Sequence, residues 1–96
     1  MQVRYTETAL IEINEIFAYI SEHTASAAKR VVARIERTIR NIGDFPEMAQ
    51  ETREPGVRRI PSGRYPYLVY YTVEADEVVI LHVRHGARQW PWEQED

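Results

Sequence analysis

The sequence predicts an α+β fold, in which a short N-terminal strand and an antiparallel helical hairpin pack on one face of a small antiparallel β-sheet. Two observations predict it. Apolar residues recur at helical spacing in the first half of the chain, and the second half holds short runs rich in valine, isoleucine and tyrosine. Because 96 residues can build only one hydrophobic core, we expect residues 1–96 to form a single domain.

The N-terminal part is expected to be a short edge strand over residues 2–5, followed by a helix over about residues 8–22. The apolar residues of this helix recur at helical spacing and share one face: Leu10, Ile13, Ile16, Phe17 and Ile20. Glu12 and Glu15 are expected on the opposite, solvated face. The helix should therefore cover the sheet with its apolar side and present acidic residues to water.

A second helix is expected to begin after Thr24 or Ser26, either of which can act as its N-cap, and to end at about residue 42. Its apolar face holds Ala28, Val31, Ile35, Ile39 and Ile42. Gly43 is expected to be a left-handed cap at the C-terminal end. Two helices joined by so short a connection should pack antiparallel.

Residues 44–55 are expected to form a loop, and three strands are expected at residues 57–60, 67–73 and 78–84, with a turn at residues 74–77. In the central strand tyrosines occur at both odd and even positions, so both faces of the sheet carry tyrosine. The exposed pair would be either Leu68 and Tyr70 or Tyr67 and Tyr71. Such an apolar patch invites a protein partner.

The composition limits the function classes. The net charge is −3, there is no cysteine, and no stretch of about 18 apolar residues occurs, so we expect a cytoplasmic protein with no membrane association and no disulfide. Arginines nevertheless concentrate around the strands: Arg58, Arg59, Arg64, Arg84 and Arg88. We expect several of them to gather at one end of the sheet, where arginine can hold phosphates or carboxylates in a bidentate way.

The histidines do not predict a metal site. His82 and His85 are three residues apart on a strand, so they should point to opposite faces, and we expect neither a metal nor a cofactor. His85 is placed on the helix-covered face together with Val79, Leu81 and Val83. His82 is placed on the open face with Ile80 and Arg84, which makes it the better functional candidate.

The segments GVRRI, YPYLVYYTV and EVVILHVRHGARQW, preceded by two helices and a proline-bearing loop, resemble the RelE/ParE superfamily of bacterial toxins. The closing strand with its H-G-A-R and Trp-Pro is more similar to the ParE branch, which includes proteins grouped under plasmid stabilisation. That resemblance implies the toxin of a type II toxin–antitoxin pair, which inhibits DNA gyrase by binding. It also implies a cognate antitoxin with a flexible segment that wraps the toxin, and contact with operator DNA only through the antitoxin.

The alternative that the resemblance implies is a RelE-like, metal-independent endoribonuclease that cuts messenger RNA on the ribosome. Its residues would be Arg59, His82, Arg84 and Arg88. The arginine that such enzymes keep at the start of the central strand falls at Tyr67 here. The tail holds Trp90 and Trp92 but no tyrosine, and tryptophan cannot act as a general acid or base. We therefore favour a binding protein over an enzyme.

Two sets of binding residues follow from these considerations. The target-binding set consists of Arg58, Arg59, Arg64, Arg84, Arg88 and Trp90. The antitoxin-binding set consists of Ile11, Tyr19, Leu68 and Tyr70. We further expect that replacing Arg84 or Arg88 reduces toxicity more than folding, and that replacing His85 reduces stability first.

Overall fold

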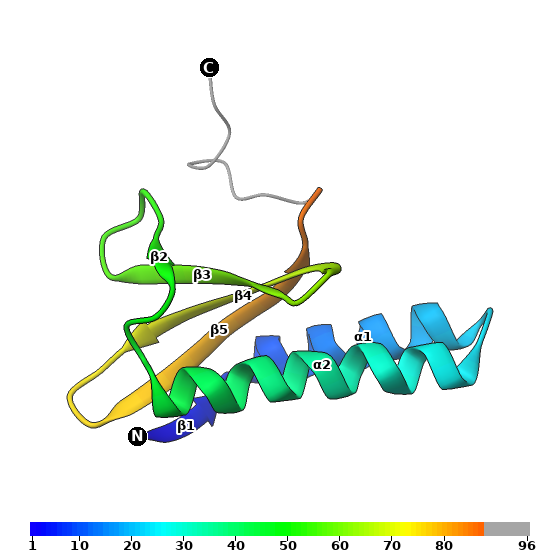
Figure 1. Cartoon of the computed structure of the whole chain (residues 1–96), viewed down its shortest axis with the longest axis horizontal. Coiled ribbons are helices and arrows are strands. Elements are labelled where there is room, and N and C mark those ends of the chain that lie inside the picture. The colour runs from blue at the N-terminus through cyan, green and yellow to red at the C-terminus, as the bar shows by residue number, and fades with distance from the viewer. Residues whose placement is uncertain (88–96) are drawn as a thin grey trace.

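The computed structural model describes residues 1–87, and its elements follow the predicted order (Figure 1). They are β1 (Gln2–Tyr5), α1 (Glu7–Ser21), α2 (Ala25–Asp44), β2 (Gln50–Glu51), β3 (Val57–Ser62), β4 (Tyr65–Val73) and β5 (Glu77–His85). The two antiparallel helices lie together on one face of the sheet (Figure 1). The α+β fold is therefore confirmed, and the two-residue strand β2 is an addition within the region expected to be a loop.

The sheet is mixed, with the strand order β1-β5-β4-β3-β2. Strand β1 pairs parallel with β5, so that Val3 lies opposite Val78, whereas the other neighbours pair antiparallel. A wholly antiparallel sheet was expected, and this edge departs from it. The reason is that a tight turn forces only consecutive strands to be antiparallel. Strands β1 and β5 lie at opposite ends of the chain, so no turn fixes their relative direction.

A β-bulge divides β5 into two parts. In the ladder with β4, Tyr70 lies opposite His82 but the next residue, Tyr71, lies opposite Ile80, so Leu81 is an extra residue without a partner. An extra residue reverses the inside–outside alternation of the strand. Before Leu81 the even-numbered residues of β5 therefore face the helices, and after Leu81 the odd-numbered residues do.

This bulge corrects part of the predicted facing of β5. Val78 and Ile80 belong to the core under the helices before the bulge, and Val83 belongs to it afterwards. The expectation that Ile80 lies on the open face is wrong, as is the expectation that Val79 and Leu81 lie under the helices. Simple alternation along the sequence cannot reveal a bulge. The predicted facing of β5 is therefore correct only for the residues after Leu81.

Helix α1 covers the sheet with a narrower stripe than the sequence suggested. Ala9 and Ile13 are buried, and Ile16 and Ile20 pack against the core, but Leu10 and Phe17 are 49% and 37% exposed. The wide apolar arc of α1 therefore exceeds what the sheet and α2 cover. In residues 1–87 neither helix is long and apolar enough to cross a bilayer.

Helix α2 supplies much of the core through Val31, Ile35, Ile39 and Ile42. Thr24 is its N-cap residue by position, without a side-chain hydrogen bond. Gly43 is not a left-handed cap, because the helix continues to Asp44 and the positive φ angles in residues 1–87 belong to Gly56 and Gly63. A Cβ atom at Gly43 would lie 3.0 Å from Cγ2 of Val3, so glycine at this position allows β1 to approach the helix closely.

Candidate functional site

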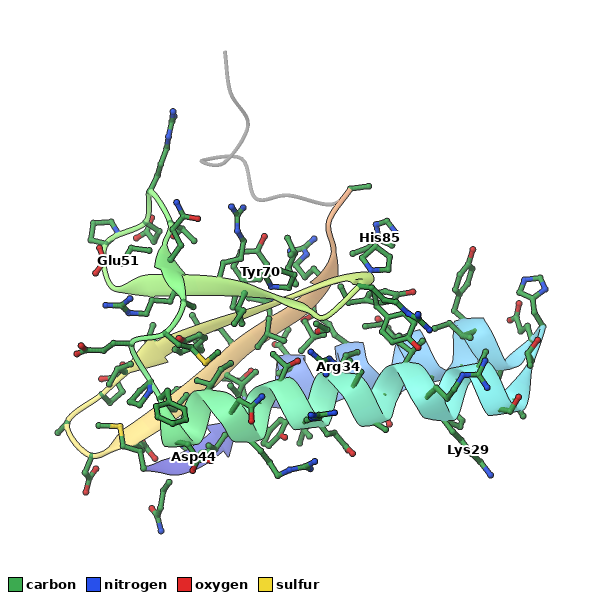
Figure 2. The ribbon with its side chains drawn as sticks, in the orientation of Figure 1. Lys29, Arg34, Asp44, Glu51, Tyr70 and His85 are labelled. Carbon is green, nitrogen blue, oxygen red and sulfur yellow. The ribbon has the colours of Figure 1, made fainter. Side chains whose placement is uncertain are left out.

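The face of the sheet opposite the helices, called here the open face, carries a mixture of arginine, histidine and apolar residues. Two cross-strand rows define it, namely Arg59, Tyr70 and His82, and Pro61, Leu68 and Arg84. Figure 2 shows Tyr70 on the side of the sheet away from the helices. Because residues directly opposite each other on antiparallel strands share a face, Arg59 and Arg84 project from the same surface.

Two of the predicted target-binding arginines lie at one end of this sheet. Arg84 is near the end of β5, and Arg64 lies in the β3–β4 turn. Gly86 N–H donates to the Pro66 carbonyl at 2.7 Å, which holds the end of β5 against the start of β4. The Arg64 guanidinium lies 5.6 Å from the ring centroid of Tyr65, a cation–π distance. Arg59 lies farther along the sheet, and the predictions for Arg88 and Trp90 concern residues outside the described range.

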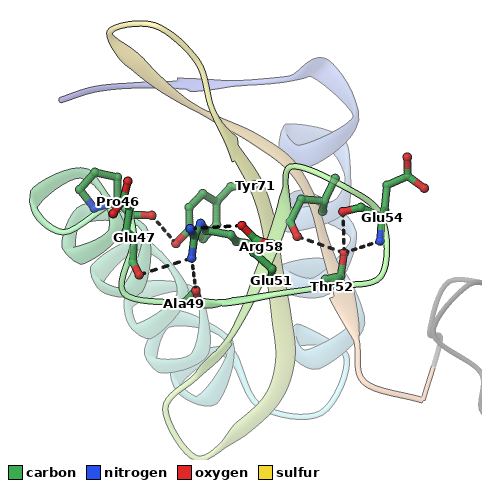
Figure 3. Close-up of polar contacts among 9 residues, drawn as sticks. Pro46, Glu47, Ala49, Glu51, Thr52, Glu54, Arg58 and Tyr71 are labelled. Atoms are coloured by element: carbon green, nitrogen blue, oxygen red, sulfur yellow. Dashed lines mark hydrogen bonds and ion pairs between the residues drawn. The ribbon is translucent and has the colours of Figure 1, made fainter.

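Arg58 does not belong to this group. It lies opposite Tyr71, which in turn lies opposite Ile80, on the helix-covered side. Its guanidinium donates to the Ala49 carbonyl at 2.6 Å (Figure 3). Its second branch lies 3.5 Å from a carboxylate oxygen of Glu51. These contacts hold the segment before β2 against the sheet. We therefore assign Arg58 a structural role, since adjacent strand residues face opposite ways and only Arg59 reaches the open face.

The patch expected at Leu68 and Tyr70 is less exposed than predicted. The alternation puts this pair on the open face and Tyr67 and Tyr71 in the core, but Tyr70 is only 1% exposed. A pocket of about 340 Å³ lies beside it, lined by Thr6, Thr8, Glu54, Val57, Tyr70, Leu81 and His82. Glu54 comes from the β2–β3 connection, so this connection reaches the open face next to Tyr70. The expectation that Tyr70 is exposed is therefore wrong, although this residue lies on the open face as expected.

Glu12 is the site residue that the sequence analysis missed. Its carboxylate accepts the Val83 N–H at 2.9 Å, and both of its oxygens lie 3.2 Å from Nδ1 of His82. Strand β1 ends opposite Ile80, so the following part of β5 has no strand on that side. A half-buried N–H there needs an acceptor, and Glu12 provides it. The expectation that Glu12 faces only water is wrong, because the unpaired edge of β5 draws it in.

A groove of about 390 Å³ lies between α1 and the last residues of β5, and we call it the α1–β5 groove. Its lining consists of Glu12, Glu15, Ile16, Tyr19, Tyr67, Val83, Arg84 and His85. The floor is apolar, and carboxylates lie on the helix side opposite Arg84 and His85 on the strand side. Burial, followed by the nearby Tyr19, raises the pKa of Tyr67, so this hydroxyl stays protonated at neutral pH.

His85 lies on the helix side of the sheet, as expected, but it is exposed rather than buried. Its ring meets the Tyr67 ring edge-on with centroids 5.4 Å apart, and its Nδ1 accepts the Ala87 N–H at 3.0 Å. His85 lines the α1–β5 groove together with Tyr19 and, because it is exposed, lies at the mouth of that groove. Its expected role as a buried stabilising residue is therefore not supported by its exposure.

The predicted antitoxin-binding residues fall on two surfaces. Tyr19 lines the α1–β5 groove, and Ile11 lies two turns earlier on α1, 49% exposed. Leu68 and Tyr70 lie on the open face instead. Within residues 1–87 no group of three metal-ligating side chains is close enough to hold an ion. The geometry brings together the α1–β5 groove and an arginine-bearing sheet end.

Comparison with known proteins identifies relatives over nearly the whole chain. A family model described as "ParE toxin of type II toxin-antitoxin system, parDE" matches residues 3–90. The chain is 36% identical over 90 residues to "Putative toxin Y4kP" of Sinorhizobium fredii, covering 94% of this chain and 93% of that protein.

Solved structures share the fold at lower sequence identity. A chain of the "Chromosomal ParDE TA system from P. aeruginosa" superposes with a TM-score of 0.80 and 19% identity, covering 88% of this chain and 95% of that one. A "YoeB/ParE toxin from Agrobacterium tumefaciens" gives a TM-score of 0.60 and 15% identity, covering 88% and 98%. These likenesses extend to the mixed sheet and the helical hairpin described above.

Proposed function

The chain belongs to the ParE toxin family of type II toxin–antitoxin systems, and we propose that it inhibits DNA gyrase by docking through the arginine end of its sheet. Arg64 and Arg84, with Arg59 farther along the open face, are the residues that carry this proposal. Arginine binds carboxylates and phosphates through two parallel hydrogen bonds, which gives a docking surface both strength and orientation.

The neutralising partner is a cognate antitoxin, whose segment occupies the α1–β5 groove. The apolar floor formed by Ile16, Tyr67 and Val83 would bury an apolar side chain of that segment. Arg84 and His85 on one side would pair with acidic residues, and Glu12 and Glu15 on the other with basic ones. Because Arg84 borders both the groove and the open face, an antitoxin in the groove would cover part of the target-binding surface. Contact with operator DNA then runs through the antitoxin.

The test is to induce the chain alone in cells, and in parallel with the product of a neighbouring short reading frame. We expect loss of negative plasmid supercoiling with intact messenger RNA, and restoration of supercoiling by the partner. Messenger cleavage at defined codons while supercoiling stays unchanged would contradict gyrase as the target. The same experiment tests the antitoxin proposal independently, because the partner should restore growth whichever target the chain inhibits.

A second candidate function, ribosome-dependent cleavage of messenger RNA, is favoured by the Glu12–His82 pair. A carboxylate that orients an imidazole is an arrangement used for general acid–base catalysis, and His82 also lines the pocket beside Tyr70. His82 would take the proton from a ribose 2′-hydroxyl, whose oxygen then bonds to the adjacent phosphorus. The bond from phosphorus to the 5′-oxygen of the next nucleotide breaks, and that oxygen takes a proton from water, while Arg59 and Arg84 would stabilise the charge that develops on the phosphate. Cleavage on ribosomes that disappears in His82→Gln would support this reading, and its absence in the wild-type protein would exclude it.

A further inference from the structure

The two helices of the hairpin carry opposite charge. Helix α1 contains glutamates and neither lysine nor arginine. Helix α2 contains five cations, Lys29, Arg30, Arg34, Arg37 and Arg40, against the two acids Glu36 and Asp44. The acidic helix lies beside the edge of β5, which it caps through Glu12. The positive charge of this small, acidic protein is therefore concentrated on α2 and the sheet end.

Three of these arginines share one flank of α2. Arg30, Arg34 and Arg37 are spaced four and three residues apart, which places them on one side of a helix, and we call them the α2 arginine flank. Arg30 and Arg37 are exposed and Arg34 is half-buried. None of the three forms an ion pair with a carboxylate of residues 1–87. The charges of the exposed Arg30 and Arg37 are thus available to an external anion.

Arg34 places this flank next to the β3–β4 turn. A Cβ atom on Gly63 would lie 2.5 Å from its Nε, so the guanidinium packs directly on the β3–β4 turn (Figure 2). Nε of Arg34 and the hydroxyl of Ser62 are both buried without a hydrogen-bond partner. The same turn carries Arg64, which is exposed. Arg34 therefore connects the flank to the turn that carries Arg64.

We propose that the α2 arginine flank, together with Arg64, binds the phosphodiester backbone of a B-form DNA duplex. The run from Arg30 to Arg37 covers about 10 Å along the helix axis, at about 1.5 Å per residue. Phosphates of one strand recur about every 3.4 Å along a B-form duplex, so the flank spans about three of them. Planar guanidinium groups match phosphate oxygens in pairs, and a flank of this kind holds the backbone without reading the sequence.

An acidic protein fits this surface less well. Protein–protein interfaces that bind tightly contain buried aromatic or aliphatic anchors surrounded by polar residues. The exposed large apolar residues of the described chain are Met1, Leu10, Ile11, Phe17, Tyr19, Phe45 and Met48, and none of them lies on α2. The acids of α1 would also be repelled by a phosphate backbone, which orients the molecule with α2 toward the nucleic acid.

The inference goes beyond the proposed function, because its surface is centred on α2 and shares only Arg64 with the arginine end of the sheet. Its test is fluorescence anisotropy of a labelled 24-base-pair DNA duplex, and of an RNA duplex of the same length, titrated with the full chain at several salt concentrations. The double variant Arg30→Gln/Arg37→Gln removes two charges from the flank. The matched control Lys29→Gln/Arg40→Gln removes two charges from a different side of the same helix.

We expect the flank variant to weaken duplex binding by roughly tenfold or more at low salt, and to reduce the slope of log K against log salt by about 1.8 for DNA. The control should change affinity by less than about twofold. Tighter binding of the DNA duplex than of the RNA duplex would support the proposal, and tighter binding of the RNA duplex would overturn the assignment to DNA. Equal losses in both double variants, absence of binding at 50 mM salt, or full displacement of the duplex by equimolar polyglutamate would each overturn the proposal.

Discussion

The two faces of the sheet are built from the same strands but differ in what fills them. On the face under the helices, β4 contributes Tyr67, Val69 and Tyr71 to a core in which every residue is nearly inaccessible. On the open face the same strand contributes Leu68 and Tyr70 to a surface that also holds arginine, histidine and a pocket. The face under the helices supplies the main core, whereas the open face is the surface through which we propose that the chain binds its target. Substitutions on adjacent residues can therefore separate the two roles.

The sharpest stability contrast is expected between Ile80 and Leu81, neighbours that the bulge sends to opposite faces. Ile80→Ala removes a fully buried side chain and should lower the free energy of unfolding by about 2–5 kcal/mol. Leu81→Ala, at a half-buried bulge position, should cost about 1 kcal/mol or less. Urea unfolding of both variants checks this. Equal losses would mean that the bulge does not divide the strand as described.

The next largest effect is expected at the edge of β5, where Glu12 replaces a missing strand. Glu12→Ala removes the acceptor of the Val83 N–H and one partner of His82, and should cost about 1–3 kcal/mol. Glu15→Ala, on the same helix but exposed, is the matched control and should cost less than about 0.5 kcal/mol. Thermal melts of the two variants measure how much stability Glu12 provides at the edge of β5. A Glu12 variant as stable as the Glu15 variant would show that the edge needs no acceptor.

Tyr71 links the core face to the segment before β2. Its hydroxyl donates to the Pro46 carbonyl at 2.8 Å, so Tyr71→Phe should cost about 1 kcal/mol at pH 7. Burial raises the pKa of Tyr71 above its ordinary value of 10.0, so the folded state holds this proton more tightly than the unfolded one. The stability that it provides is complete below pH 10 and is lost as the pH rises through the folded pKa.

The wild-type protein should therefore lose more stability than Tyr71→Phe when the pH is raised from 9 to 11. Denaturant unfolding at both pH values measures the difference. A variant that loses as much stability as the wild type would assign the alkaline sensitivity to other groups, such as Tyr5 and Tyr67, whose pKa values burial also raises.

The smallest effects on stability are expected at the groove mouth. Arg84→Ala and His85→Ala should each change the free energy of unfolding by less than about 1 kcal/mol, because the first side chain is half-buried and the second is exposed. Arg84→Ala should nevertheless cause much weaker growth arrest in cells than the wild type. Thermal melts of the same variant should show that it is folded. A His85 variant that unfolds at growth temperature would restore the earlier view of this residue as structural.

The sequence predicted the elements of the fold well because their signals are local. The helical spacing of Val31, Ile35 and Ile39 and the β-branched run of β5 are visible without any tertiary information. The site was harder, because its decisive features depend on contacts between distant segments. The parallel pairing of β1, the bulge at Leu81 and the inward turn of Glu12 all follow from how the sheet edge is completed, which no local pattern records. The contacts of Arg58 were not predicted for the same reason, since its partners are two backbone carbonyls and the Glu51 carboxylate.

The most direct test of the proposed function is DNA supercoiling by purified gyrase in the presence of the purified chain. We expect the wild-type protein to inhibit supercoiling, with Arg84→Ala/Arg64→Ala requiring at least about tenfold more protein for the same effect, as expected when bidentate contacts at an interface are lost. The folded control Arg58→Lys keeps the charge on the helix-covered side and should inhibit like the wild type. Undiminished supercoiling at saturating wild-type protein, in a preparation that binds its antitoxin, would contradict gyrase as the target.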